Sequence, residues 1–175
     1  SISKGAPTFV IAEAGVNHGG DMEVAKKLID LAVEAEADAV KFQTFKAEHL
    51  ILSDIQKAPY QKNSTNAKET QFDMLKRLEV SREQNLELKQ YCIDKDIIFL
   101  TTPFDEESLE EIDDLDLPAY KVASTDTTNL PFLKKIAKKG KPIFLSTGMS
   151  YLSEVRSALE TIYEYNKDVV LLQCT

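Results

Sequence analysis

Short apolar runs rich in β-branched residues alternate with helical segments along the whole chain, and this alternation constrains the fold more than any other feature. The apolar runs occupy residues 9–14, 39–45, 97–102, 119–124, 142–147 and 169–174. Each run is apolar on successive positions, which is typical of strands buried on both faces. Strict alternation of strands and helices predicts an α/β fold whose strands are parallel and joined by right-handed crossovers.

Two α/β architectures fit this alternation: a doubly wound sheet and a (β/α)8 barrel of the TIM type. A dinucleotide-binding doubly wound fold would carry a GxGxxG motif after its first strand, and residues 13–20 (EAGVNHGG) lack that spacing. A barrel instead places reactive side chains at the C-terminal ends of many strands. Polar residues stand at these ends in five of the runs. We therefore expect residues 1–175 to form an incomplete TIM-type barrel, with six of its eight strands.

The stretch between the second and third runs is longer than one crossover helix requires. It contains a polar insertion at about residues 46–68, which includes Pro59 and the sequence NSTN at residues 63–66. A polar insertion of this length after a strand is a lid or a disordered loop, and both alternatives stay open. No segment has the composition of a linker between domains, so we expect one domain.

Composition limits the partners that this chain can have. It carries 21 Lys and Arg against 29 Asp and Glu, which gives a formal charge of −8. An acidic surface repels nucleic acid and anionic lipid, so we expect neither as a partner and expect any bound anion to need local positive charge. There is no apolar run of membrane-spanning length and no signal-peptide pattern at the start. Cys92 and Cys174 form no CxxC motif, so we expect a reduced, cytoplasmic setting.

Two lysines lie inside apolar strands, Lys41 in AVKFQ and Lys121 in YKVA. A buried ammonium without a partner is costly, so each lysine needs an anion. One interpretation is a shared phosphate or carboxylate site, to which Thr102, Ser124 and Ser146 on neighbouring strands would add hydroxyl donors. The alternatives are an ion pair with a nearby carboxylate, a stem that carries the charge to the rim, and a Schiff-base lysine.

A carboxylate, Glu13, also lies within an apolar strand. It would pair with one of the strand lysines, or it would orient a hydroxyl or move a proton beside a reacting carbonyl. The turn that follows, Asn17-His18-Gly19-Gly20, opens a helix, and its backbone N–H groups favour an anion unless it is a plain helix-entry turn. His18 alone makes no metal site.

Several of these segments together resemble the sialic acid synthase family, which includes the N-acetylneuraminate, legionaminate and pseudaminate synthases. The segments are residues 11–20 (IAEAGVNHGG), 40–44 (VKFQT), 101–104 (TTPF), 120–124 (YKVAS), 129–131 (NLP) and 145–149 (LSTGM). They cover nearly the whole chain in the family's order. The resemblance implies a β/α barrel that condenses phosphoenolpyruvate with an N-acetylmannosamine-type sugar to a nonulosonic (sialic-type) acid and releases phosphate.

The resemblance also implies roles for individual residues. Phosphoenolpyruvate would be held by Lys41, Thr102, Lys121, Ser124 and Ser146. Glu13 and Gln43 would contact the sugar, and Phe104 would line the site. Glu13, Lys41 and Lys121 are the candidate catalytic residues, and Asn17 and His18 are further candidates for substrate contact.

The implied reaction forms a carbon–carbon bond. The enol carbon attacks the open-chain sugar aldehyde, which a divalent metal, Mn²⁺ or Mg²⁺, polarises. Water then adds at C2, and the tetrahedral intermediate loses phosphate through cleavage of a C–O bond. The family's metal ligands are two histidines on later strands, beyond residue 175, and its C-terminal antifreeze-protein-like domain is also expected to lie outside this chain. The full-length protein is expected to be a homodimer.

Residues 124–129 (STDTTN) differ from the Ser-Gly-Glu pattern of N-acetylneuraminate enzymes, which favours a legionaminate-type sugar. Two other functions stay open: a barrel aldolase or lyase that uses Lys41 or Lys121 as a Schiff base, and a truncated, non-catalytic module that binds a phosphorylated ligand. An open six-stranded sheet would leave unpaired edges at its first and last strands, and we expect such edges to promote self-association.

Overall fold

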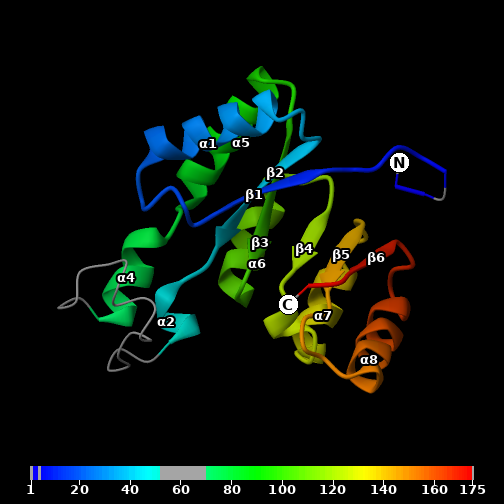
Figure 1. The fold of residues 1–175 in the computed structure, drawn as a ribbon. Helices are drawn as coiled ribbons and strands as arrows, with labels where there is room; N and C mark the ends of the chain where they lie inside the picture. Colours follow the sequence, from blue (N-terminus) through cyan, green and yellow to red (C-terminus); the bar gives the residue numbers. More distant parts are fainter. Residues whose placement is uncertain (1, 4, 52–69, 175) are drawn as a thin grey trace.

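The computed structural model describes residues 2–3, 5–51 and 70–174, and within them the predicted alternation of strands and helices is confirmed (Figure 1). The strands are β1 (Ile11–Gly15), β2 (Ala39–Thr44), β3 (Ile98–Pro103), β4 (Tyr120–Val122), β5 (Ile143–Ser146) and β6 (Val169–Leu172). The helices are α1 (Met22–Glu34), α2 (Ala47–Leu50), α4 (Gln71–Leu78), α5 (Arg82–Asp94), α6 (Glu106–Asp113), α7 (Leu130–Ala137) and α8 (Leu152–Tyr163), and η1 (Ser124–Asp126) is a short 3₁₀ turn. Each strand begins within two residues of its predicted start.

Polar side chains cap the starts of α1 and α5. Asp21 accepts hydrogen bonds from the backbone N–H groups of Glu23 and Val24 at the start of α1. Ser81 and Gln84 form a reciprocal capping box at the start of α5. Each side chain satisfies N–H groups that the first helical turn leaves without a partner. These local signals therefore set the spacing between strands.

The described strands form two three-stranded parallel sheets, with orders β1-β2-β3 and β4-β5-β6. The prediction of one continuous six-stranded sheet is therefore wrong at the junction between β3 and β4, although these two strands lie next to each other. β4 has only three residues because Pro118 precedes it closely and the chain turns into η1 directly after it. Proline lacks a backbone N–H, so Pro118 itself cannot donate to a ladder and the strand begins after it.

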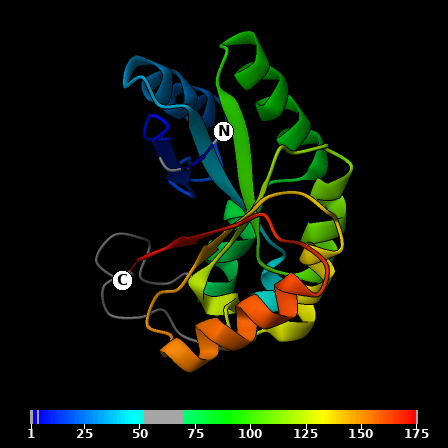
Figure 2. The ribbon, with the colours of Figure 1, turned by 90° about the vertical axis from the view of Figure 1, so that its right-hand side faces the viewer.

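Side chains alternate between two faces of the strands. One face packs against the helices, with Phe42 of β2 buried in the same cluster as Ile29 of α1 and Leu88 of α5. Figure 1 shows the strands between α1 and α5 on one side and α7 and α8 on the other, and Figure 2 shows the helices around the outside of the strands. The opposite face carries a second apolar cluster, the apolar floor, whose buried members are Ala39, Leu100, Ala119 and Phe144. The two faces give this fold one helix-covered side and one side free to build a site.

The insertion predicted at residues 46–68 begins with the short helix α2. Most of that insertion, residues 52–68, lies outside the described residues, so the choice between a lid and a disordered loop stays a prediction. In the described part of the chain, no helix has the length and apolar character needed to cross a lipid bilayer.

Two glycines with positive φ allow a direct test of packing at the turn that leads into α1. Gly20 has φ +89°, and a Cβ added there would lie 2.5 Å from the backbone oxygen of Arg77. Gly140, after α7, has φ +72° and open space around it. At either position, a left-handed backbone conformation destabilises a residue with a side chain by about 1–2 kcal/mol. The steric conflict at Gly20 lowers the stability of the folded state by about a further 1–3 kcal/mol. We therefore expect Gly20→Ala to lower the free energy of unfolding by more than Gly140→Ala.

Urea unfolding of both variants, followed by circular dichroism, measures this difference. Equal losses of stability would contradict the close approach of Gly20 to α4.

Candidate functional site

A layer of polar side chains lies directly above the apolar floor. Alternation along a strand returns to the same face every second residue. Ala39 is followed two residues later by Lys41, Leu100 by Thr102, Ala119 by Lys121, and Phe144 by Ser146. The floor-packed residues Ile11 and Leu172 are followed in the same way by Glu13 and Cys174. The polar layer thus draws one side chain from every described strand or its end, on the side that lacks helices.

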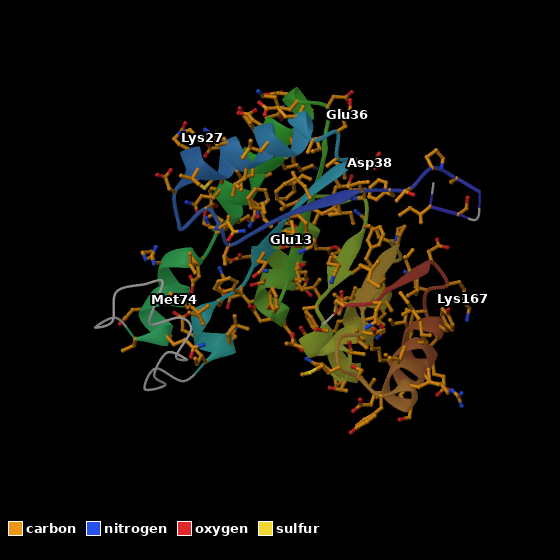
Figure 3. All side chains as sticks on the ribbon, viewed as in Figure 1. Glu13, Lys27, Glu36, Asp38, Met74 and Lys167 are labelled. Carbon is orange, nitrogen blue, oxygen red and sulfur yellow. The ribbon has the colours of Figure 1, made fainter. Side chains whose placement is uncertain are left out.

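Lys41 is bound within this layer by two neighbours. Its side chain is buried, and its Nζ lies 2.7 Å from Glu13 Oε2 and donates to Thr102 Oγ1 over 3.1 Å. Parallel pairing of β1 with β2 sets Glu13 directly opposite Lys41. The sequence-based interpretation that Glu13 pairs with a strand lysine is confirmed for Lys41. Glu13 is half exposed and lies near the centre of the molecule (Figure 3), so its other oxygen can meet a ligand.

Within the described residues, Lys121 has no such carboxylate partner. Its residue is only 9% exposed, and its Nζ donates to the backbone oxygen of Val122 over 2.7 Å. In the described part of the chain, no carboxylate oxygen lies within 4.0 Å of this ammonium. Burial, and then the positive charge of Lys41, lower the pKa of Lys121 to about 8. Two ammonium groups therefore act on each other across this layer. Within the described residues only Lys41 forms an ion pair, although the charges of Cys174 and Glu13 also act on Lys121.

Hydroxyl groups lie just after β4 and at the end of β5, in the same layer as Lys121. Ser146 is buried and Ser124 is half buried, and Gly148 lies between Ser124 and Cys174. A Cβ added to Gly148 would lie 2.5 Å from Ser124 Cβ and 3.9 Å from Cys174 Sγ. A side chain at Gly148 does not fit this space, and its φ of +51° also favours glycine. A cavity of about 250 Å³ opens beside Ser124 and Gly148.

Gln43 and Phe104 extend the layer toward the carboxyl ends of β2 and β3. Gln43 Nε2 and Glu13 Oε1 lie 3.5 Å and 3.2 Å from the point where a Cβ on Gly15 would stand, so the two side chains flank the same glycine. Phe104 is half buried, and its ring meets Phe45 edge-on with centroids 6.4 Å apart. Glu13 and Gln43 therefore form one corner of the layer, separate from the hydroxyl groups beside Lys121.

Asn17 and His18 are not brought to this layer. His18 is 2% exposed and its ring lies 6.2 Å from that of Phe42, whose side chain faces the helices. Its Nδ1 accepts a hydrogen bond from the Gly20 backbone N–H, and burial lowers the pKa of the imidazole. Nε2 therefore carries the proton, and it is buried without a partner. Asn17 is exposed on the same turn, so contact of either residue with a substrate stays a prediction.

Cys174 and Gly148 belong to the layer although sequence reasoning did not select them. The signal for Cys174 was the alternation in residues 169–174, since Leu172 and Cys174 share one face while Leu171 and Gln173 are exposed. The signal for Gly148 was a glycine two residues after a strand, where close approach of backbone is common.

The described residues do not fit a metal ion. No group of three or more His, Cys, Asp and Glu side chains converges in residues 5–51 and 70–174. Lys41 already occupies one oxygen of Glu13, the carboxylate closest to the layer. The chemistry of this layer is therefore that of ammonium, hydroxyl, amide and one carboxylate group, which suits the binding of an anion.

Comparison with known proteins identifies the family. The family model described as the NeuB family matches residues 28–175. N,N'-diacetyllegionaminic acid synthase of Campylobacter jejuni is 46% identical over 171 residues, which are 96% of this chain and 51% of that protein. N-acetylneuraminate-9-phosphate synthase of Homo sapiens is 37% identical over 97% of this chain and 47% of its own length. The chain thus spans about half the length of the curated relatives it matches.

Solved structures agree with this assignment. A crystal structure of N-acetylneuraminic acid synthetase from Leptospira borgpetersenii in complex with citrate superposes with a TM-score of 0.84, at 32% identity over 97% of this chain and 55% of that chain. Phospho-2-dehydro-3-deoxyheptonate aldolase from Thermotoga maritima shares the fold at a TM-score of 0.68, with 14% identity over 93% of this chain and 41% of that chain. The resemblance to the sialic acid synthases is confirmed, and the chain belongs to the NeuB family.

Proposed function

We propose that the protein condenses phosphoenolpyruvate with an N-acetylmannosamine-type sugar to a nonulosonic acid and releases phosphate. One observation carries the proposal: Lys121 is nine-tenths buried, and among residues 5–51 and 70–174 its ammonium has no carboxylate partner and lies beside the ammonium of Lys41. A buried charge needs a counter-charge, and a bound anion would supply it. Relatives named as synthases of sialic and legionaminic acids support this choice of reaction.

We define the anion site as Lys41, Thr102, Lys121, Ser124 and Ser146. Phosphoenolpyruvate carries a phosphate and a carboxylate, and this site offers two ammonium groups and three hydroxyl groups. Charge-assisted hydrogen bonds from ammonium to phosphate are about twice as strong as neutral ones. As the C–O bond to phosphate breaks, negative charge grows on the departing group, and an ammonium already in place stabilises it without reorganisation.

Glu13 and Gln43 would bind the sugar. Oε2 of Glu13 is held by Lys41, which fixes the carboxylate and leaves Oε1 to accept from a sugar hydroxyl or to relay a proton. The Gln43 amide, at the same corner, both donates and accepts. The enol carbon would then attack the open-chain aldehyde, water would add at C2, and phosphate would leave. Because 46% identity links the chain to a legionaminic acid synthase, we propose a legionaminate-type sugar.

We propose that residues 1–175 are the N-terminal part of a (β/α)8 barrel domain. An apolar cavity of about 500 Å³, lined by Phe9, Leu100, Phe144 and Val170 among others, lies below the polar layer, where further barrel strands would cover it. We propose that the further barrel units, an antifreeze-protein-like domain and the ligands for Mn²⁺ or Mg²⁺ lie in chain outside residues 1–175. The full-length protein would be a cytoplasmic homodimer.

A Schiff-base aldolase is the second candidate, because Lys121 is buried beside another cation and its pKa is lowered to about 8. The two functions differ in their covalent chemistry. Only an aldolase would join pyruvate to Lys121 as an imine that borohydride reduces to a stable adduct.

Turnover tests the proposed function directly. We expect the complete gene product, supplied with Mn²⁺, phosphoenolpyruvate and N-acetylated mannosamine-type sugars, to release phosphate only when the sugar is present. Borohydride with pyruvate should leave the mass of the protein unchanged. An adduct on Lys121 would favour the aldolase, and phosphoenolpyruvate binding without phosphate release would favour a non-catalytic binding module.

The charge of Lys121 makes ligand affinity depend on pH. A phosphomonoester is fully ionised above its second pKa near 6, so the ligand's charge is constant above pH 7.5. Lys121 loses its proton as pH rises through about 8, and we expect affinity for phosphoenolpyruvate to fall about tenfold or more between pH 7.5 and 9.5. Lys121→Met should weaken binding at pH 7.5 by about 1.5–3 kcal/mol and flatten this dependence.

Titration calorimetry across this pH range measures both effects. Lys138→Met is the matched control, because Lys138 is exposed at the end of α7, and it should keep the wild-type profile. Wild-type affinity that stays constant to pH 9.5 would remove Lys121 from the anion site.

The variant Gln43→Leu tests whether the sugar and phosphoenolpyruvate bind to different parts of the polar layer. Loss of one hydrogen bond to the sugar, about 1.4 kcal/mol, should raise the sugar KM about tenfold. Affinity for phosphoenolpyruvate, measured by calorimetry, should stay within about twofold, because Gln43 lies outside the anion site. Equal losses toward both ligands would show that Gln43 does not discriminate between them.

A further inference from the structure

The end of β6 turns Cys174 toward the anion site. Ser146 pairs with Leu172 in the parallel ladder, and the Thr147 backbone N–H donates to the Leu172 oxygen over 3.0 Å. Leu172 packs against the apolar floor, so Cys174, two residues later, shares its face. Cys174 is half buried whereas Gln173, on the other face, is exposed. The thiol therefore stands in the polar layer without being sealed from solvent.

The thiol and the anion site share donors. Cys174 Sγ and Ser124 Oγ lie 3.9 Å and 2.8 Å from the position of a Cβ on Gly148, so both border the same small space. Partial burial raises the pKa of the Cys174 thiol. Interactions with Ser146, the Gly148 backbone and Ser124, together with the charge of Lys121, lower it by more, so the pKa lies below its usual range. The sulfur thus lies among groups that a phosphate or carboxylate oxygen would also use.

Lys121 gives an independent indication that a ligand binds here. Its ammonium is nine-tenths buried, and its one hydrogen bond within the described residues goes to the Val122 backbone oxygen. An ammonium has three donors, so this one keeps donors for an anion. An anion that takes them would lie against Ser124, Ser146 and the sulfur of Cys174.

We propose that Cys174 lines the anion site. A bound phosphoenolpyruvate then protects its thiol from modification, and modification of the thiol prevents phosphoenolpyruvate from binding. This inference rests on the proposed function. Iodoacetamide provides the modification: the sulfur attacks its methylene carbon, an S–C bond forms, the C–I bond breaks, iodide leaves and the thiol proton passes to solvent. The added group would fill space beside Gly148, where even one extra carbon meets Ser124.

The first measurement is the rate of labelling. The complete gene product is treated with iodoacetamide at pH 7.5, and modification of Cys174 is followed by peptide mass spectrometry with and without phosphoenolpyruvate or inorganic phosphate. At a ligand concentration ten times its Kd, about one site in eleven is free, so labelling should slow about tenfold. Sodium chloride at equal ionic strength should not protect. Cys92 is the internal reference, because it is fully buried and burial raises its thiol pKa to about 12.

The second measurement is the reciprocal one. Calorimetry should show that labelled protein binds phosphoenolpyruvate at least about tenfold more weakly than unlabelled protein. The variant Cys174→Ser should bind equally well before and after treatment, which excludes effects of other labelled sites.

These outcomes separate the two proposals. Phosphoenolpyruvate that binds without slowing the labelling of Cys174 overturns this inference and leaves the proposed function intact. Protection and loss of binding after labelling, in a protein that releases no phosphate with any sugar, support the inference while the proposed function fails. Absence of binding by calorimetry overturns both.

Discussion

The structure depends on two ammonium groups that face the same side of the sheets, of which only one is paired with a carboxylate in the part of the chain that the structure describes. Lys41 is neutralised by Glu13 at 2.7 Å, whereas the hydrogen bond of the buried Lys121 within these residues goes to a backbone oxygen. Like charges in a partly dehydrated layer repel, and the lowered pKa of Lys121 records that repulsion together with burial. A folded protein tolerates this cost where it has a use, and neutralisation by a bound anion is the use that these contacts support.

The fold makes this arrangement possible by separating two faces. Apolar side chains such as Phe42 and Leu88 fill the space between strands and helices, and they supply most of the burial. The other face needs only a narrow apolar floor, because its next layer is polar. Parallel strands bring their carboxyl ends to one edge, so side chains from β1 to β6 meet there although the chain separates them by up to about 160 residues.

Sequence patterns predicted the elements well because buried strands and capped helices have local signatures. They also identified Lys41, Lys121 and Glu13, because a charge inside an apolar strand is conspicuous. They failed at the junction of β3 and β4, where pairing depends on how the chain around Pro118 and η1 turns in space. His18 was selected because the turn after the first strand offers backbone N–H groups to an anion, and its contact with a substrate stays a prediction, since the structure places its ring against Phe42. Cys174 escaped notice because a single cysteine carries no motif, although the register of β5 with β6 and the period of two place it at the level of Gly148.

A crystal structure of the complete gene product with phosphoenolpyruvate bound tests the central claim most directly. The account predicts that oxygen atoms of one ligand lie at hydrogen-bond distance, about 2.7–3.2 Å, from Nζ of both Lys41 and Lys121. A ligand bound elsewhere, or two ammonium groups on opposite faces of the strands, would contradict it.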